Sequence, residues 1–386
     1  MGKRILIHYP VLNLGGAEMS ILRLVRGLAD RGWQVDMVVT TGGGPLEGKL
    51  DPRVRLTRLR SRPSGNALAQ ARGVGGLLRA IPDLVIYAAQ RIREAVISAE
   101  FLFRRYDVAA VGLHGLSPAF CCHWVRARTR LHFIRNDVGE VDRRGKVTPN
   151  IERYHRRIDH YICVADSVRE ALVRRYPYVE GKAVTIYNLL DPDEMRRRAE
   201  EEPNPFAAYG DGLKVLSVCR LLEEAKGLAR MAEVCRRLLD EGLDFHWFVV
   251  GDGPDRALLE AKVRDLGLSE RFILLGRQAN PFPYYRHADV VAVLSYYEGL
   301  CGAVNEAKVM GKAVVATTFS GITEQIEDGV GGLIVANDED AIVEGMRRVL
   351  TDAGLRARLG AGPLNPAILD DEAKLDALEA LMGAAW

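Results

Sequence analysis

The stretch LNLGGAEMSILRLVRGLADRG, Leu12 to Gly32, follows the apolar run RILIHY and joins two adjacent glycines to a helical pattern. Gly15 and Gly16 stand where a strand would end, and Glu18 stands at the opening of the helix. Glycines let backbone N–H groups approach a ligand closely, and a helix N-terminus favours an anion such as phosphate. A tight strand-to-helix turn, with Glu18 placed favourably in the first helical turn, explains the same residues. The glycine pair alone leaves both interpretations open.

Strand and helix patterns alternate along the whole chain. Apolar runs that end in glycine-rich turns alternate with helical periods, which is typical of parallel sheets with helices on both faces. A chain of 386 residues is long enough for two such domains. The sequence therefore predicts an α/β protein with two Rossmann-like, doubly wound domains. The expected strands are RILIHY, QVDMVVT, VRLTRL, DVAAVGLH, RLHFIRN, HYICVA and AVTIYN, then LKVLSVC, FHWFVVGDG, RFILLG, DVVAVLS, AVVATT and GLIV.

The domain boundaries follow from changes in composition. We expect an N-terminal domain over residues 1–190, a C-terminal domain over 191–365, and a C-terminal helix over 366–386 that packs back on the N-terminal domain. The segment 189–212 is rich in proline, glycine and charge and has little apolar periodicity. It is the best candidate for a linker.

Charge is distributed unevenly between the two halves. Residues 1–190 carry 31 Lys and Arg against 17 Asp and Glu, a net charge of +14, whereas residues 191–386 carry 22 against 34, a net charge of −12. Such segregation supports two domains and indicates that the first one meets something anionic. Two oppositely charged lobes that attract each other would show the same distribution.

The sequence predicts a cytoplasmic protein, because it lacks a secretory signal pattern and any apolar stretch that could span a bilayer. Residues 66–106 resemble two helices with apolar faces and an arginine-rich remainder. Such helices can lie on an anionic membrane surface, which would make the protein peripheral at the inner face of the membrane. They can also simply pack on their own domain, and we favour packing.

Metal and redox cofactors are not expected. The six cysteines show no metal-type CxxC spacing, and several stand in apolar runs, where small buried thiols are common. The glycine pair does not belong to a GxGxxG pattern, and the second strand ends in VVTTGGG without the acid expected on an adenosine ribose. An NAD-dependent enzyme is therefore disfavoured.

Two cations mark the first strand exit of the second half. In VLSVCRLLEEAKGL, Arg220 ends a strand and Lys226 stands just before a helix. Two cations near a helix N-terminus suit the charge of a diphosphate. A solvated pair of surface cations is the alternative.

Two glutamates stand further along, in SYYEGLCGAVNEAKVMGKAVVATT. If a helix begins near Gly302, Glu298 lies in the loop before it and Glu306 lies in its second turn. Carboxylates there can each accept two hydroxyl hydrogen bonds, which suits sugar and ribose rings. A polar helix face would show the same spacing.

Together these residues resemble the retaining glycosyltransferases of the GT-B fold, family four (glycosyl transferases group 1). The resemblance rests on GGAE near the start, Arg220 with Lys226, VVGDGP, and Glu298 with Glu306 before GKAVVAT, and it covers nearly the whole chain. It implies two Rossmann-like domains that face a cleft. The second would bind a nucleoside diphosphate sugar and the first would offer the acceptor site.

The resemblance also implies roles for individual residues. Glu298 would hold the donor sugar, Glu306 would hold the nucleotide ribose, and Arg220 and Lys226 would clamp the diphosphate. The full set that the resemblance places at the nucleotide sugar is Gly15, Gly16, Gly253 in VVGDGP, Arg277 in the GRQAN segment that borders the base, Glu298 and Glu306. Fixed cations and helix N-termini would stabilise the leaving phosphate, so that no metal is required.

Two features depart from the family pattern. Family members often carry a histidine at the strand end that here reads LHFIRNDVGE, where this chain has Arg135, and the nearest histidine is His114. Arginine cannot act as a base at neutral pH, but it can hold an anionic acceptor or the leaving phosphate. The family's GFG is altered to GLCGAVN, which introduces Cys301 and Asn305.

The sequence thus predicts a retaining, hexosyltransferase-type glycosyltransferase (EC 2.4). It would move a sugar from a nucleoside diphosphate sugar, with a UDP-sugar favoured, to a polysaccharide or glycolipid in cell-surface glycan biosynthesis. No nucleic-acid partner is expected. The predicted catalytic residues are Glu298, Arg220, Lys226, Arg135 and His114. The alternatives are a non-catalytic carbohydrate-binding or scaffold subunit, and a sugar-nucleotide epimerase of the same fold.

Overall fold

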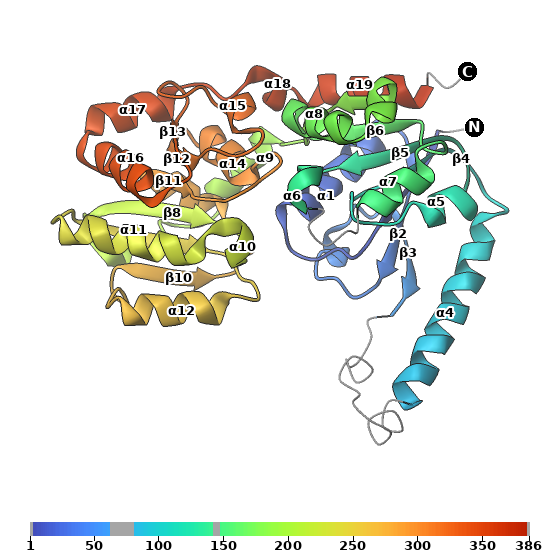
Figure 1. Cartoon of the computed structure of the whole chain (residues 1–386), viewed down its shortest axis with the longest axis horizontal. Coiled ribbons are helices and arrows are strands. Elements are labelled where there is room, and N and C mark those ends of the chain that lie inside the picture. The colour runs from blue at the N-terminus through green and yellow to red at the C-terminus, as the bar shows by residue number, and fades with distance from the viewer. Residues whose placement is uncertain (1–2, 62–80, 142–146, 384–386) are drawn as a thin grey trace. The chain divides into compact units, whose positions relative to one another are not determined.

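The computed structural model describes residues 3–61, 81–141 and 147–383, which form two compact units (Figure 1). Unit 1 contains the chain up to Val164, Arg169–Asn188, and the chain from Lys374 on. Unit 2 contains Ala165–Val168 and Leu189–Ala373. Each unit has its own parallel sheet, so the two-domain α/β architecture predicted from the sequence is confirmed.

The described part of unit 1 forms a seven-stranded parallel sheet with the order β3-β2-β1-β4-β5-β6-β7. Strand order reverses beside β1, which pairs with β2 on one side and β4 on the other. The carboxyl ends of β1, β4 and β5 therefore meet at one edge, where ligands bind in doubly wound sheets. The strands are β1 (Arg4–Tyr9), β2 (Gln34–Thr41), β3 (Arg55–Arg60), β4 (Arg105–Val111), β5 (Arg126–Ile134), β6 (His160–Cys163) and β7 (Ala183–Thr185).

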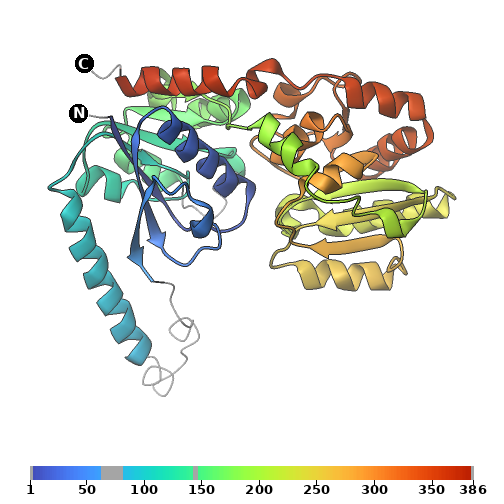
Figure 2. The ribbon, with the colours of Figure 1, turned by 180° about the vertical axis from the view of Figure 1, so that it is seen from behind.

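Helices cover the sheet of unit 1. The buried face of α1 presents Ile21, Val25 and Leu28 to the sheet, and Figure 2 shows this helix lying over the strands. Glu379 of the last helix accepts hydrogen bonds from Arg31 and Trp33, which holds that helix against unit 1. The helices are α1 (Gly16–Asp30), α4 (Ile81–Phe101), α5 (Ala119–His123), α6 (Val138–Val141), α7 (Thr148–Tyr154), α8 (Asp166–Arg175, in unit 1 from Arg169) and α19 (Asp371–Gly383, in unit 1 from Lys374).

Unit 2 contains a six-stranded parallel sheet with the order β10-β9-β8-β11-β12-β13. Here the order reverses between β8 and β11, which pair directly. The loops after β8, β9, β11 and β12 consequently leave the same edge. The strands are β8 (Leu213–Val218), β9 (Phe245–Val250), β10 (Phe272–Gly276), β11 (Val290–Val293), β12 (Ala313–Thr317) and β13 (Leu333–Val335).

Two layers of helices sandwich the sheet of unit 2. Successive strand residues point to opposite faces. Trp247 packs into the core formed with α11, α12, α16 and α17, whereas the Phe248 ring contacts the tilted ring of Phe206, with ring centroids 4.3 Å apart. On that second face α9 contacts α13 and α14. The helices are α9 (Pro192–Ala199), α10 (Glu223–Lys226), α11 (Leu228–Asp240), α12 (Arg256–Asp265), α13 (Phe282–His287), α14 (Gly302–Val309), α15 (Ile322–Gln325), α16 (Glu339–Thr351), α17 (Ala353–Ala361) and α18 (Pro366–Leu369).

The prediction of a linker over residues 189–212 is wrong, because this segment is folded into unit 2. Asp191 caps α9 by accepting a hydrogen bond from the Glu194 N–H. Met195 and Phe206 are buried, and Phe206 contacts Phe248 and Tyr284. Leu189, Leu190 and Ala199 of this charged segment are buried as well, so a count of apolar periodicity underestimates how firmly it packs.

The two helices expected over residues 66–106 are described only in part. The first falls largely on residues 62–80, which lie outside the described residues. The second is α4, which ends in the core at Phe101 but extends away from the sheet at its other end (Figure 1). Its large side chains Val85, Ile92 and Val96 are more than 60% exposed. Packing on its own domain therefore accounts for only part of its apolar surface.

Candidate active site

The loops at the carboxyl edge of unit 2 carry most of the residues that the sequence singled out. Arg220 follows β8 and is exposed, and Lys226 is the last residue of the short helix α10. Glu298 lies in the loop between β11 and α14. The prediction that a helix begins near Gly302 is confirmed, and Glu306 lies in its second turn.

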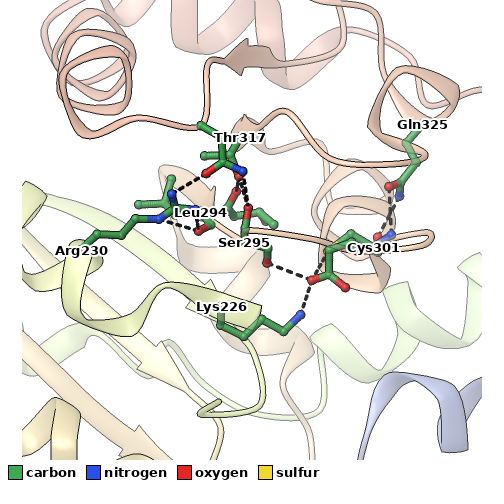
Figure 3. Close-up of polar contacts among 10 residues, drawn as sticks. Lys226, Arg230, Leu294, Ser295, Cys301, Thr317 and Gln325 are labelled. Carbon is green, nitrogen blue, oxygen red and sulfur yellow. Dashed lines mark hydrogen bonds and ion pairs between the residues drawn. The ribbon is translucent and has the colours of Figure 1, made fainter. Parts of the chain in front are cut away.

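Lys226 and Glu298 form an ion pair, although they are 72 positions apart in the chain (Figure 3). The side chains are only 19% and 15% exposed, respectively. Burial works to lower the pKa of Lys226, but the Glu298 carboxylate and other nearby groups raise this pKa above its ordinary value. Lys226 is therefore charged at neutral pH. The cation that was predicted to bind phosphate and the carboxylate that was predicted to bind the sugar are therefore paired with each other.

Three donors converge on one oxygen of Glu298. Lys226 Nζ donates to Oε1, the Ser295 hydroxyl donates to it at 2.9 Å, and the Cys301 thiol lies 3.7 Å away (Figure 3). No other described residue donates to this carboxylate, so Oε2 is left to accept hydrogen bonds from a ligand. A carboxylate fixed on one side in this way is suited to orient a sugar hydroxyl.

The loop that carries Ser295 is held by buried polar side chains. Thr317 Oγ1 donates to the Ser295 carbonyl at 2.6 Å, and Asn337 Nδ2 donates to it at 3.3 Å. Arg230 is 4% exposed, donates to the Leu294 carbonyl through Nε at 3.0 Å, and also donates to the Asn337 side chain (Figure 3). These bonds reach the loop from β12 and α11. They fix the backbone from which Ser295 reaches Glu298.

Gln325 holds the start of α14. Its side-chain oxygen accepts from the Cys301 N–H at 3.0 Å, and its Nε2 donates to the Cys301 carbonyl at 2.8 Å and to Asn305 Oδ1 at 2.5 Å. Burial, followed by the Glu298 carboxylate, raises the pKa of the Cys301 thiol to about 12. The thiol therefore remains protonated and can donate. Cys301 and Asn305, which depart from the family pattern, are both parts of this local clamp.

Glu306 lies against a wholly buried tyrosine of α13. Burial and then the Glu306 carboxylate raise the pKa of Tyr285 above its ordinary value. The Tyr285 hydroxyl is therefore neutral at pH 7. This tyrosine supports the face of α14 that carries Glu306.

Gly253 and Arg277 occupy the loops after β9 and β10. A Cβ atom at Gly253 would lie 2.2 Å from the Leu221 carbonyl oxygen, so glycine is required where these two loops meet. This close approach explains Gly253 without a ligand. Arg277 is exposed. The roles of both residues in nucleotide-sugar binding stay predictions.

The two glycines of unit 1 differ in their surroundings. Gly15 is the N-cap of α1 in an extended conformation, and a Cβ atom there would lie 2.5 Å from a Glu18 carboxylate oxygen. At Gly16 a Cβ atom would meet nothing within 4 Å. The turn itself does not demand glycine at position 16. Gly16 therefore leaves open space in front of the N-terminus of α1.

Arg135 and His114, the predicted catalytic residues of unit 1, lie together after β5 and β4. The Arg135 backbone N–H donates to His114 Nδ1 at 3.3 Å. Burial, followed by the Arg135 charge, lowers the pKa of His114 to about 4. His114 is therefore neutral at pH 7, with its proton on Nε2. In this form its Nε2–H can donate a hydrogen bond to a ligand, but it cannot accept a proton from one.

Several residues of the site were not predicted from the sequence. They are Ser295, Thr317, Arg230, Asn337 and Gln325, and all of them act through other protein groups. The only signal in the sequence is that polar residues end apolar strands, as in VVAVLS and AVVATT. Among the described residues, no three His, Cys, Asp or Glu side chains form a group able to hold a metal ion.

Comparisons with known proteins place these observations in a family context. The model of Glycosyltransferase Family 4 matches residues 14–194, and that of Glycosyl transferases group 1 matches residues 198–362. The chain is 26% identical over 367 residues to the 2-deoxystreptamine glucosyltransferase of Streptomyces kanamyceticus, which covers 89% of this chain and 92% of that protein. It is 24% identical over 360 residues to the lipopolysaccharide core biosynthesis glycosyltransferase LpsE of Rhizobium meliloti, with 91% and 90% covered.

A solved structure shows the same fold. The crystal structure of Anabaena HepE in complex with UDP and glucose superposes with a TM-score of 0.74 at 16% sequence identity, covering 99% of this chain and 100% of that one. The two-domain fold is thus shared across low sequence identity.

The arrangement around Glu298 predicts a selective effect of Ser295. Ser295→Ala removes a hydrogen bond to a charged group, worth about 1.5 kcal/mol or about tenfold in binding. If Glu298 holds the sugar, we expect the affinity for a nucleotide sugar to fall by this factor and the affinity for the nucleoside diphosphate alone to stay within about twofold. Titration calorimetry with both ligands measures the difference.

Ser217→Ala is the matched control for Ser295→Ala. Ser217 is also buried and donates to the Ala292 carbonyl at 2.8 Å, but it does not contact Glu298. Ser295→Thr keeps the hydroxyl and should restore sugar binding. Equal losses of nucleotide-sugar affinity in both alanine variants would show that Ser295 has only a structural role.

The open space at Gly16 generates a second prediction. Gly16→Ala should leave the free energy of unfolding unchanged or raise it by up to about 1 kcal/mol, because alanine suits a helix better than glycine. Binding of a nucleoside diphosphate sugar should nevertheless weaken, because the methyl group fills the space before the helix N-terminus. Gly48→Ala, also in open space, is the control. If the Gly16→Ala variant binds the nucleoside diphosphate sugar as tightly as the wild type, the glycine pair only forms a turn.

Proposed function

Because the chain belongs to the GT-B glycosyltransferases of family 4, we propose that it transfers a sugar, with retention of anomeric configuration, from a nucleoside diphosphate sugar to a glycan or glycolipid acceptor. The observation that carries the proposal is the Lys226–Glu298 pair, in which one carboxylate oxygen is held by three donors and the other is left for a ligand. A partly buried, charged lysine beside such a carboxylate would combine recognition of phosphate and of sugar in one site.

UDP is the nucleotide that we favour. The structural neighbour HepE was solved with UDP and glucose, which supports a UDP-sugar donor. In the proposed complex Glu298 Oε2 accepts from a sugar hydroxyl and Glu306 accepts from the ribose. Arg277 and Gly253 border the nucleotide.

The chemistry needs positive charge where the phosphate leaves. In the retaining scheme the bond from the anomeric carbon to the phosphate oxygen breaks, and the acceptor oxygen bonds to the same face of that carbon. The acceptor proton passes to the departing phosphate. Arg220 and Lys226 stabilise the charge that develops on this phosphate, so we propose that no metal is needed. Lys226 has three N–H donors and can contact a phosphate while it still holds Glu298.

The acceptor is proposed to be a polysaccharide or glycolipid of the cell surface. Relatives such as LpsE act in lipopolysaccharide core biosynthesis, which supports this class. The net charge of +14 in residues 1–190 favours an anionic acceptor or an anionic membrane. Unit 1 would then supply the acceptor side of the reaction through Arg135 and His114.

We also propose that α4 brings the protein to the inner face of the membrane. In the described part of the chain, no helix is both long enough and apolar enough to cross a bilayer. The exposed side chains of α4, among them Val85, Ile92 and Val96, lie on a helix that also carries Arg91 and Arg93. An apolar surface flanked by arginines suits the headgroup region of an anionic bilayer.

The transfer assay tests the proposed function. Wild-type protein is incubated with labelled UDP-, GDP-, ADP- and CMP-sugars and a glycan acceptor, and NMR determines the anomeric configuration of the product. Lys226→Ala should lower kcat/KM about a hundredfold, because it removes a cation that acts on developing charge. Lys262→Ala breaks a more exposed ion pair, between Lys262 of α12 and Glu233 of α11, and should leave turnover unchanged.

Three results would contradict the transferase mechanism. An altered sugar nucleotide formed without any acceptor would indicate an epimerase. Saccharide binding without turnover of any nucleotide sugar would indicate a binding or scaffold subunit. A product of inverted configuration would exclude retention.

The membrane proposal predicts salt-sensitive binding. Wild-type protein should sediment with phosphatidylglycerol vesicles at low salt and dissociate as salt rises, because counterions screen the arginines. Ile92→Glu with Val96→Glu should abolish sedimentation, whereas Leu258→Glu, at an exposed apolar residue of α12, should not. Binding that persists in the α4 variant would exclude this helix as the contact.

A further inference from the structure

Arg135 is a buried cation whose hydrogen-bond partners are all neutral. Its side chain donates to the Gly112 carbonyl at 3.0 Å, to Ser20 Oγ at 2.9 Å and to Asn188 Oδ1 at 2.8 Å, and the residue is only 8% exposed. No described carboxylate forms an ion pair with it. Buried charges in proteins are normally paired, because an unpaired one is costly. The Glu18 carboxylate acts electrostatically on Arg135, but no described carboxylate contacts the guanidinium, so the site keeps a positive charge that a bound anion can contact.

Three polar groups around Arg135 lack an acceptor in the described part of the chain. Arg135 Nη2 makes no hydrogen bond, and neither does the Nε2–H of His114, whose Nδ1 is occupied by the Arg135 backbone N–H. The Tyr9 hydroxyl, wholly buried at the end of β1, also has no partner. Burial raises the pKa of Tyr9, while the Arg135 charge acts to lower this pKa and the Glu18 carboxylate acts to raise it, so the hydroxyl is influenced by both charges.

These groups have the chemistry of an anion site. Tyr9, Arg135 and His114 come from the ends of β1, β5 and β4, which meet at the ligand-binding edge of the sheet. A guanidinium stays charged at any physiological pH, and its planar fork fits a carboxylate or a phosphate. Ser20 and Asn188 orient this fork through Nη1, which leaves Nη2 for the ligand.

We propose that Tyr9, His114 and Arg135 bind the anionic group, carboxylate or phosphate, of an acidic acceptor saccharide. The assignment of that saccharide as acceptor rests on the proposed function. The anion site itself rests on the geometry of unit 1. The neutral saccharide of the same shape should be a poor ligand, because it would bring no anion into contact with the buried guanidinium.

A purely structural Arg135 predicts something different. In that case its hydrogen bonds only join β4, α1 and the segment at Asn188, and its replacement lowers stability without changing ligand preference. Tyr9 separates the two interpretations, because its hydroxyl contributes no hydrogen bond to the described protein. Tyr9→Phe should therefore leave thermal stability unchanged, yet weaken the binding of an acidic ligand about fivefold.

The test uses the full chain and three probes: methyl glucuronide, glucose 6-phosphate and the neutral methyl glucoside. Titration calorimetry should show that wild-type protein binds one acidic probe at least tenfold more tightly than the neutral one, and the preferred probe identifies carboxylate or phosphate. Arg135→Gln should abolish the preference and Arg135→Lys should keep part of it. Arg130→Gln, which loses only bonds to the carbonyls of Cys121 and Val125, should retain the preference.

Two outcomes would overturn the inference. The first is equal affinity of wild-type protein for the acidic and neutral probes. The second is a tenfold loss of nucleoside diphosphate binding in Arg135→Lys and Tyr9→Phe with acidic-probe binding unchanged, which would make these residues part of the donor site. Acid-selective binding without transfer from any nucleotide sugar would instead refute the proposed function and leave the anion site intact.

Discussion

The ion pair between Lys226 and Glu298 is the interaction on which the rest of the unit 2 site depends. The Glu298 carboxylate and the Lys226 ammonium are both partly buried, and the carboxylate favours the charged form of Lys226 against the loss of solvent around it. The pair joins the loop after β8 to the loop after β11, the two strands between which the sheet reverses its order. The two charged side chains are thereby held at the edge where doubly wound sheets bind ligands.

The polar groups behind this pair keep it in one geometry. Ser295 reaches Glu298 only because Thr317, Asn337 and Arg230 hold the surrounding backbone carbonyls. Gln325 does the same for the first peptide of α14. Groups that act on developing charge are most effective when they are held in place beforehand, and in the proposed function these side chains would provide that support.

The buried cation of unit 1, Arg135, differs from Lys226 in the charge of its hydrogen-bond partners. Arg135 has neutral partners only, whereas Lys226 has a carboxylate. A cation paired within the protein can exchange part of its contacts with a ligand, whereas a cation that no carboxylate contacts gains most when the ligand itself is anionic. Arg135, at the strand end where the resemblance to the family implies a histidine, therefore gives this edge of the sheet a fixed positive charge.

The sequence alone determined the strands, the two-domain α/β class and the start of α14, because the alternation of apolar runs and glycine turns is a local property of the chain. It also singled out Lys226, Glu298 and Arg135 as chemically important positions. Only the tertiary structure decided that Lys226 pairs with Glu298, that the segment 189–212 is folded, and that Ser295 and Gln325 support the site. These contacts join residues that are far apart or face one another across loops, and their existence depends on strand order and side-chain direction, which no local pattern specifies.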